Sequence, residues 1–150
     1  MENRMHQQVF IKFYPKGING LPRGRQGGNM EKILIVGCKK AMDDVCIGCS
    51  RCMVGFNRRV GEFKAYKDKD AELIGLINCG DCPGATIVTR LAQVKLWNKA
   101  VDETVTKVHI APCIVDHCPY KDVLISKIKA KAGVEVIEGC HPYKPSDIFA

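Results

Sequence analysis

The stretch Ile33-Leu34-Ile35-Val36-Gly37-Cys38 decides the fold of this chain. A continuous apolar run that is rich in β-branched side chains is typical of a strand buried on both faces. Three other runs, at residues 73–78, 107–111 and 134–138, have the same character. A cysteine follows each of the four runs at once or within two residues. We therefore expect four strands, each with a thiol at its carboxyl end.

Two helical patterns lie between these runs. Residues 85–101 place an apolar stripe on one face of a helix, formed by Ile87, Leu91, Val94 and Val101. Residues 120–132 form a second such helix, and Gly133 is a suitable residue to end it. Alternating strands and helices imply parallel strands joined by right-handed crossovers. The sequence predicts an α/β fold with an open, mostly parallel sheet of about four strands and helices on both faces, a three-layer arrangement like that of flavodoxin and Rossmann folds.

Nine cysteines in 150 residues form the candidate site. Ligands of open α/β sheets bind beyond the carboxyl ends of the strands, which is where most of these thiols are expected. Clustered thiols in a chain without a secretory signal more often bind metal or do redox chemistry than form structural disulfides. The expected metal ligands are Cys38, Cys46, Cys49, Cys52, Cys79, Cys82, Cys113, Cys118, Cys140 and His141.

The run Cys46-Ile47-Gly48-Cys49-Ser50-Arg51-Cys52 carries the strongest local signal. Three thiolates at this spacing match the beginning of bacterial ferredoxin ligation, in which a fourth thiolate completes a [4Fe–4S] cluster. The fourth thiolate would have to come from another strand end. Such a run must wrap as a loop, and Gly48 supplies the backbone freedom for it. Residues 49–57 are expected to form a short helix.

The segment Cys79-Gly80-Asp81-Cys82-Pro83-Gly84 has two interpretations. Two thiols at this spacing can chelate one metal ion, because zinc–sulfur bonds are short. The same pattern is found in thiol–disulfide oxidoreductases, with Cys79 attacking and Cys82 resolving the mixed disulfide. In both cases a following helix N-terminus would stabilise a thiolate. The segments Cys113 to Cys118 and Cys140-His141 repeat the arrangement of a strand followed by soft ligands.

The sequence does not name a reaction. No nucleophile–base pair or phosphate-binding loop is recognisable. A binding or electron-relay module that serves a partner protein is therefore a third possibility, beside a domain that holds zinc or an iron–sulfur centre and a thiol–disulfide oxidoreductase. His109 lies between Val108 and Ile110, and we expect a hydrogen-bonded core residue there, not a ligand. Taken singly, Cys38 and Cys140 are equally well explained as small buried hydrophobes.

The net charge of +7 does not indicate a nucleic-acid-binding protein. Residues 1–29 hold five Lys or Arg against one Glu and so supply +4 of it, which leaves an ordinary surface on the remainder. No run of about 18 apolar residues and no secretory signal is visible, so we expect no membrane association. An odd number of cysteines without such a signal favours the reducing cytoplasm.

Residues 1–29 differ in composition from the rest of the chain. Residues 15–29 are rich in Gly, Pro and Arg, so we expect disorder there, and residues 9–14 are a candidate edge strand. The triplet before Met30 is what a translated ribosome-binding site would encode, so residues 1–29 are alternatively an artefact and Met30 the natural start. Residues 30–150 are expected to form one cysteine-rich α/β domain.

The residues quoted above resemble the CGGC-domain proteins, small prokaryotic domains with a central Cys-Gly-Gly-Cys and many further Cys and His. The resemblance extends over about residues 32–141 and includes the strand that ends at Cys38, the Cys46 to Cys52 region, Cys79 to Gly84, Ala111-Pro112-Cys113, Cys118-Pro119 and Glu138 to His141. Asp81 stands where the name-giving motif has its second glycine. The resemblance implies metal binding, commonly of zinc, whereas the local Cys46 to Cys52 run favours an iron–sulfur cluster.

Overall fold

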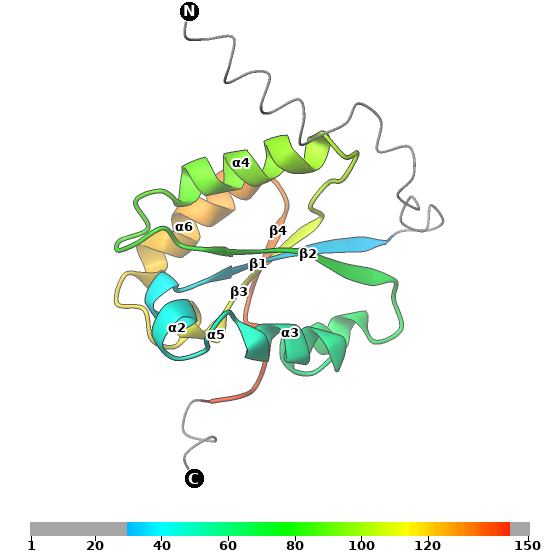
Figure 1. The fold of residues 1–150 in the computed structure, drawn as a ribbon, viewed down its shortest axis with the longest axis horizontal. Coiled ribbons are helices and arrows are strands. Elements are labelled where there is room, and N and C mark those ends of the chain that lie inside the picture. The colour runs from blue at the N-terminus through cyan, green and yellow to red at the C-terminus, as the bar shows by residue number, and fades with distance from the viewer. Residues whose placement is uncertain (1–29, 145–150) are drawn as a thin grey trace, which may run out of the picture.

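Four parallel strands form one open sheet at the centre of the molecule. The computed structural model describes residues 30–144. The strands are β1 (Glu31–Gly37), β2 (Ala71–Asn78), β3 (Lys107–Ile110) and β4 (Glu135–Glu138), in the order β2-β1-β3-β4. All three strand pairings are parallel, and helices cover both faces of the sheet (Figure 1). The predicted three-layer α/β fold is confirmed.

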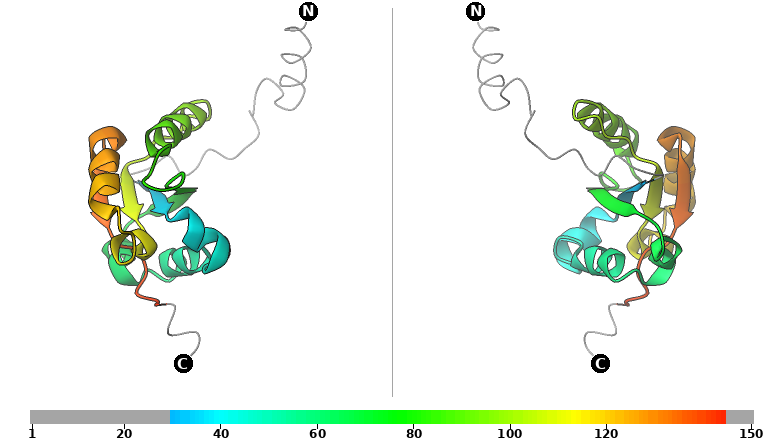
Figure 2. Two further views of the ribbon diagram at one scale, coloured as in Figure 1. Left: turned by 90° about the vertical axis from the view of Figure 1, so that its left-hand side faces the viewer. Right: turned by 90° about the vertical axis from the view of Figure 1, so that its right-hand side faces the viewer.

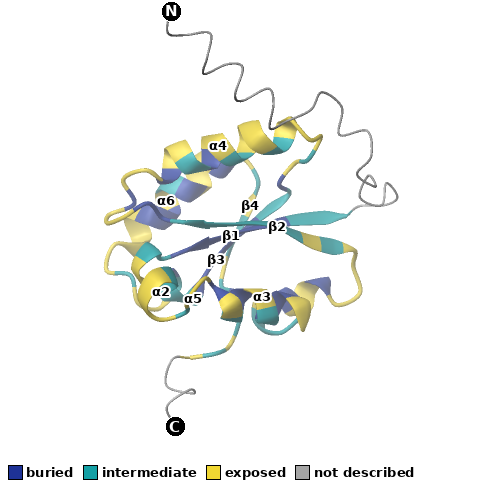
Figure 3. Cartoon of the chain, viewed as in Figure 1, coloured by how far each residue is buried: buried dark blue, intermediate teal, exposed yellow. Residues whose placement is uncertain are grey.

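Strand β1 lies in the interior of the sheet because it pairs on both sides. Its register joins Ile35 to Leu76 of β2 and to His109 of β3. The last five residues of β1 are buried, and β1 is dark blue in Figure 3. Burial on both faces explains why the β1 sequence is continuously apolar and does not alternate with polar residues.

Two long helices cover one face of the sheet. Helix α4 (Ile87–Lys99) and helix α6 (Lys121–Ala132) lie side by side there in both views of Figure 2 and in Figure 1. Gly133 ends α6 in the left-handed region, at φ 69°, as predicted. The expected extension of α4 to residue 101 is wrong: the helix ends at Lys99, and Val101 is 51% exposed instead of lying on the buried stripe.

Shorter helices cover the opposite face and the carboxyl edge. Helix α3 (Ser50–Asn57) and the 3₁₀-helix η1 (Gly61–Tyr66) lie under the sheet (Figure 1). Two short helices, α2 (Lys39–Asp44) and α5 (Pro112–Val115), stand where β1 and β3 end. The short helix at residues 49–57 was expected from the sequence, whereas η1, α2 and α5 were not.

Two expectations concern residues outside the described range. The proposed disorder or artefactual origin of residues 1–29, and the candidate edge strand at residues 9–14, lie beyond residues 30–144. Between residues 30 and 144, no helix combines the length and the apolar character that a bilayer crossing requires.

Candidate metal centre

The carboxyl edge of the sheet brings together thiols from all four strands. Cys38 follows β1 and Cys79 follows β2 without an intervening residue, and Cys140 follows β4 after Gly139. Cys113 lies within α5, beyond the end of β3, because Pro112 begins a helical turn there. This is the edge at which parallel strands were expected to place them.

Cys113 lies between the two faces of the sheet. Its side chain packs against the apolar clusters of both faces, and its Sγ accepts a hydrogen bond from the Cys38 backbone N–H at 3.1 Å. Burial raises the pKa of Cys113 to about 12, against a smaller lowering from that hydrogen bond. In the absence of a cation, Cys113 is therefore a neutral thiol at physiological pH.

Three thiols form a buried group below the sheet. Cys49, Cys52 and Cys140 are 3%, 4% and 2% exposed, and all belong to the apolar cluster that α3 and η1 build. The Cys52 side chain contacts both of the others. The hydrogen bond with Cys52, together with burial, raises the pKa of Cys49, and the hydrogen bond with Cys140 has the largest raising effect on Cys52. The raised pKa values keep Cys49 and Cys52 neutral, and Cys52 lies close to both of its neighbours.

The loop before α3 directs the Cys49 and Cys52 side chains into the core. Ile47, Gly48 and Cys49 adopt positive φ angles of 40°, 71° and 58°. Gly48 takes this conformation at no steric cost, as the sequence predicted, whereas the two other residues are held in a less favourable region. The turn leaves Cys49 at the N-terminal boundary of α3 and Cys52 in its first turn. Cys46, at the entrance of the loop, is half-buried, and burial raises its pKa.

His141 adds a nitrogen ligand beside Cys140. Its Nδ1 atom is buried and has no hydrogen-bond partner among the described residues. Burial, followed by the nearby Arg51 charge, lowers the pKa of His141, so the ring is neutral and can coordinate. Gly55 of α3 makes room for it, because a Cβ at Gly55 would lie 2.7 Å from the Cβ of His141.

The Cys79–Cys82 segment is built differently. Cys79 is buried and burial raises its pKa, whereas Cys82 is exposed. The sequence predicted a helix N-terminus next to the two thiols. Helix α4 begins only at Ile87, so its N-terminus adjoins neither of them. An attacking thiolate needs access and a low pKa. In the described structure Cys79 has neither, and the expected role of Cys79 as attacking thiol is not supported.

Cys118, like Cys38 and Cys79, packs on the α4 and α6 side of the sheet. It is half-buried and packs against the apolar cluster beneath α4 and α6, the face opposite to α3. Within residues 30–144, no group of three or more Cys, His, Asp or Glu side chains converges closely enough to hold a metal ion as the side chains stand. The structure thus gathers the thiols in contacting pairs and does not close a coordination shell.

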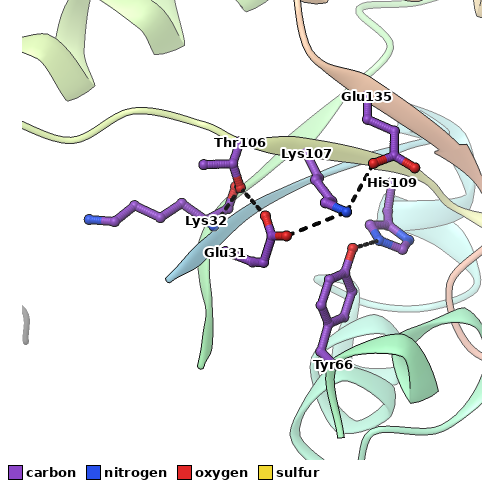
Figure 4. A network of polar contacts seen from close by, with 7 residues as sticks. All are labelled: Glu31, Lys32, Tyr66, Thr106, Lys107, His109 and Glu135. Carbon is purple, nitrogen blue, oxygen red and sulfur yellow. Dashed lines mark hydrogen bonds and ion pairs between the residues drawn. The ribbon is translucent and has the colours of Figure 1, made fainter. Parts of the chain in front are cut away.

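His109 is a hydrogen-bonded core residue, as predicted. Its Nε2 lies 2.7 Å from the Tyr66 hydroxyl (Figure 4). Its Nδ1 lies 2.8 Å from the Gly139 carbonyl oxygen. Tyr66 was missed because residues 58–70 show no strand or α-helix pattern. The spacing of three between Phe63 and Tyr66, both fully buried, matches a 3₁₀-helix and could have indicated the element.

Comparison with known proteins supports the resemblance. The model of the CGGC domain matches residues 32–141. An uncharacterized protein of Methanocaldococcus jannaschii is 32% identical over 117 aligned residues, which cover 73% of this chain and 86% of that protein. No solved structure matches the chain. Since the family match covers most of its length, this chain belongs to the CGGC-domain family, a cysteine-rich family regarded as metal-binding.

Proposed function

We propose that this chain binds a thiophilic metal centre, zinc or an iron–sulfur cluster, at the carboxyl edge of its sheet. One observation carries the proposal: the buried thiols of Cys49 and Cys140 both contact Cys52, and His141, which follows Cys140 in the chain, has a buried Nδ1 without a hydrogen-bond partner. Buried polar atoms normally have a hydrogen-bond partner, and a nitrogen left without one costs about 1–3 kcal/mol. Coordination would remove that cost.

The donor set fits such a centre. Thiolate sulfur and imidazole nitrogen are the ligands that zinc and iron–sulfur clusters prefer. Hydrogen bonds between the thiols, together with burial, raise the pKa values of Cys49 and Cys52, and burial raises that of Cys113. All three thiols stay protonated in the metal-free protein, and a bound cation would replace those protons. Because no three donors converge within the described residues, binding requires rotation of the side chains. Zinc would supply a structural or Lewis-acid centre, and an iron–sulfur cluster would supply one-electron transfer.

Three of the remaining expected ligands, Cys38, Cys79 and Cys82, form an outer group with Cys113. Cys38 donates its backbone N–H to Cys113, and Cys79 lies close to Cys38 and Cys82. This outer group offers ligands to a second metal centre, or to a larger cluster shared with Cys49, Cys52 and Cys140. Electron transfer to a partner protein would require the iron–sulfur cluster, because zinc does not change its oxidation state.

The metal content of anaerobically purified protein tests the proposal. We expect stoichiometric zinc without colour, or iron and sulfide with broad visible absorption from sulfur-to-iron charge transfer. Reconstitution of the metal-free, reduced protein with each metal should restore the same species. A chain that carries neither metal and takes up neither on reconstitution contradicts the proposed function.

A further inference from the structure

His109 is not explained by the proposed metal site. It lies in β3 and is 0% exposed, the one polar or charged residue in the buried core of residues 30–144. Its ring packs against Phe63 and Tyr66, with centroid distances of 4.8 Å and 5.6 Å. Burial of an imidazole is unfavourable unless both of its nitrogen atoms find partners. Here both do.

The chemistry of the partners fixes the direction of these hydrogen bonds. The Gly139 carbonyl can only accept, so the Nδ1 of His109 carries the proton and donates to it. The Nε2 of the neutral ring then accepts from the Tyr66 hydroxyl (Figure 4). Burial lowers the pKa of His109 and raises that of Tyr66 to about 12, which keeps both groups in the forms that this arrangement needs.

The hydrogen bonds from Tyr66 to His109 and from His109 to Gly139 end one residue before Cys140, a proposed ligand. Gly139 adopts φ 128°, a conformation that favours glycine, and its N–H donates to the Ile110 carbonyl at 2.8 Å. The carbonyl of the next residue, Cys140, accepts from the Glu62 backbone N–H at 2.9 Å. Gly61 lies so close that a Cβ there would overlap this carbonyl. The 3₁₀-helix η1 thus holds the Gly139–Cys140 segment through its backbone and, by way of His109, through Tyr66.

We propose that His109 and Tyr66 are positioning residues that hold Gly139 and thereby aim the Cys140 thiol at Cys52 and fix the position of the adjoining His141. The inference rests on the proposed metal site, because it assigns a role to residues that support two of its ligands. Neither His109 nor Tyr66 touches the metal in this arrangement. Their contribution is the orientation of the strand end beyond β4.

The reactivity of Cys140 in the metal-free protein tests the positioning directly. We compare His109→Leu, which cannot donate to Gly139, with Phe63→Leu, which loosens the same apolar cluster without removing a hydrogen bond. The rate of Cys140 alkylation by iodoacetamide, followed by peptide mass spectrometry, should rise about tenfold more in His109→Leu than in Phe63→Leu. An equal rise in both variants overturns the inference, because core packing alone would then explain it.

Two further variants keep the test decisive if His109→Leu does not fold. Tyr66→Phe should raise the Cys140 rate by about threefold, and His109→Gln, whose amide can still donate to Gly139, should restore most of the protection. A His109→Gln rate as high as that of Tyr66→Phe or above would contradict a hydrogen-bond role.

Cobalt(II) absorption separates this inference from the proposed function. If the parent protein binds Co²⁺, His109→Leu should shift the d–d bands and release the ion about tenfold faster, whereas Phe63→Leu should keep the parent spectrum. If no form binds Co²⁺, zinc or iron, the proposed function fails while the alkylation rates still decide whether His109 positions Cys140. Unchanged bands and release in His109→Leu would contradict positioning of the ligands.

Discussion

Two pairs of cysteines share the same spacing and have opposite surroundings. Cys49 and Cys52 stand at the boundary and in the first turn of α3, are both buried, and contact each other. Cys79 and Cys82 stand in an irregular turn before α4, where one thiol is buried and the other exposed. A spacing of three therefore allows two sulfurs to approach, but the backbone around them decides solvent access and protonation.

The two turns explain the difference. Residues 47–49 all have positive φ and direct the chain from the surface into the space below the sheet. In the second turn the left-handed residues are Gly80 and Asp81, which lie between the two cysteines. A side chain at Gly80 would overlap Thr86 and approach Arg90, so that turn is packed against α4 and Cys82 stays outside. The first pair is thus placed for ligation in the core and the second at the surface.

Removal of the sulfur at Cys52 should have the largest effect, because Cys52 contacts both Cys49 and Cys140. We expect Cys52→Ser to weaken zinc or cobalt affinity by about 100-fold or more, and Cys82→Ser by less than about tenfold. Competition with a chelator of known affinity measures both. Cys118→Ser, on the α4 and α6 face, serves as the matched control for loss of a thiol. Equal losses from Cys52→Ser and Cys82→Ser would remove the contrast between the pairs.

The sequence predicts the fold far better than it predicts the contacts within the site. The four β-branched runs define the strands because burial on both faces leaves an unbroken apolar pattern. The thiol positions at the strand ends follow from parallel topology alone. The one-turn helix that carries Cys113 and the 3₁₀-helix that carries Tyr66 are set by long-range packing, so local periodicity does not show them. Pairings such as Cys52 with Cys140 depend on the same packing.

Alkaline pH should destabilise the metal-free, reduced protein through the buried thiols. The pKa of Cys113 is raised from 9.0 to about 12, and those of Cys49 and Cys52 are also raised. Above about pH 9 the unfolded chain loses protons that the folded chain keeps, so the free energy of unfolding falls as pH rises. Each such thiol contributes about 1.4 kcal/mol per pH unit until its folded pKa is reached. Chemical unfolding at several pH values measures the slope.

Variants of the two pairs sharpen this measurement, because other groups also titrate at alkaline pH. Cys52→Ser removes one thiol with a raised pKa and should make the slope shallower by about 1.4 kcal/mol per pH unit. Cys82→Ser, which removes an exposed thiol from the other pair, is the matched control for the loss of a sulfur. Parallel profiles for the parent and Cys52→Ser would show that Cys52 does not stay protonated in the fold.

The smallest expected effect concerns Asp81, which replaces the second glycine of the family motif. Asp81 has φ 73°, a region that costs most non-glycine residues about 1–2 kcal/mol and Asp less. Glycine removes that cost but loses about 0.5–1 kcal/mol of chain entropy on folding, so Asp81→Gly should stabilise the metal-free protein by about 0.5 kcal/mol. Gly80→Ala, which places a methyl group against Thr86, should instead destabilise it. Thermal or chemical unfolding distinguishes the two variants.

A clear loss of stability in Asp81→Gly would contradict this prediction. The attraction between the Asp81 carboxylate and the nearby Lys39 ammonium would then stabilise the fold by more than the strained backbone at Asp81 costs.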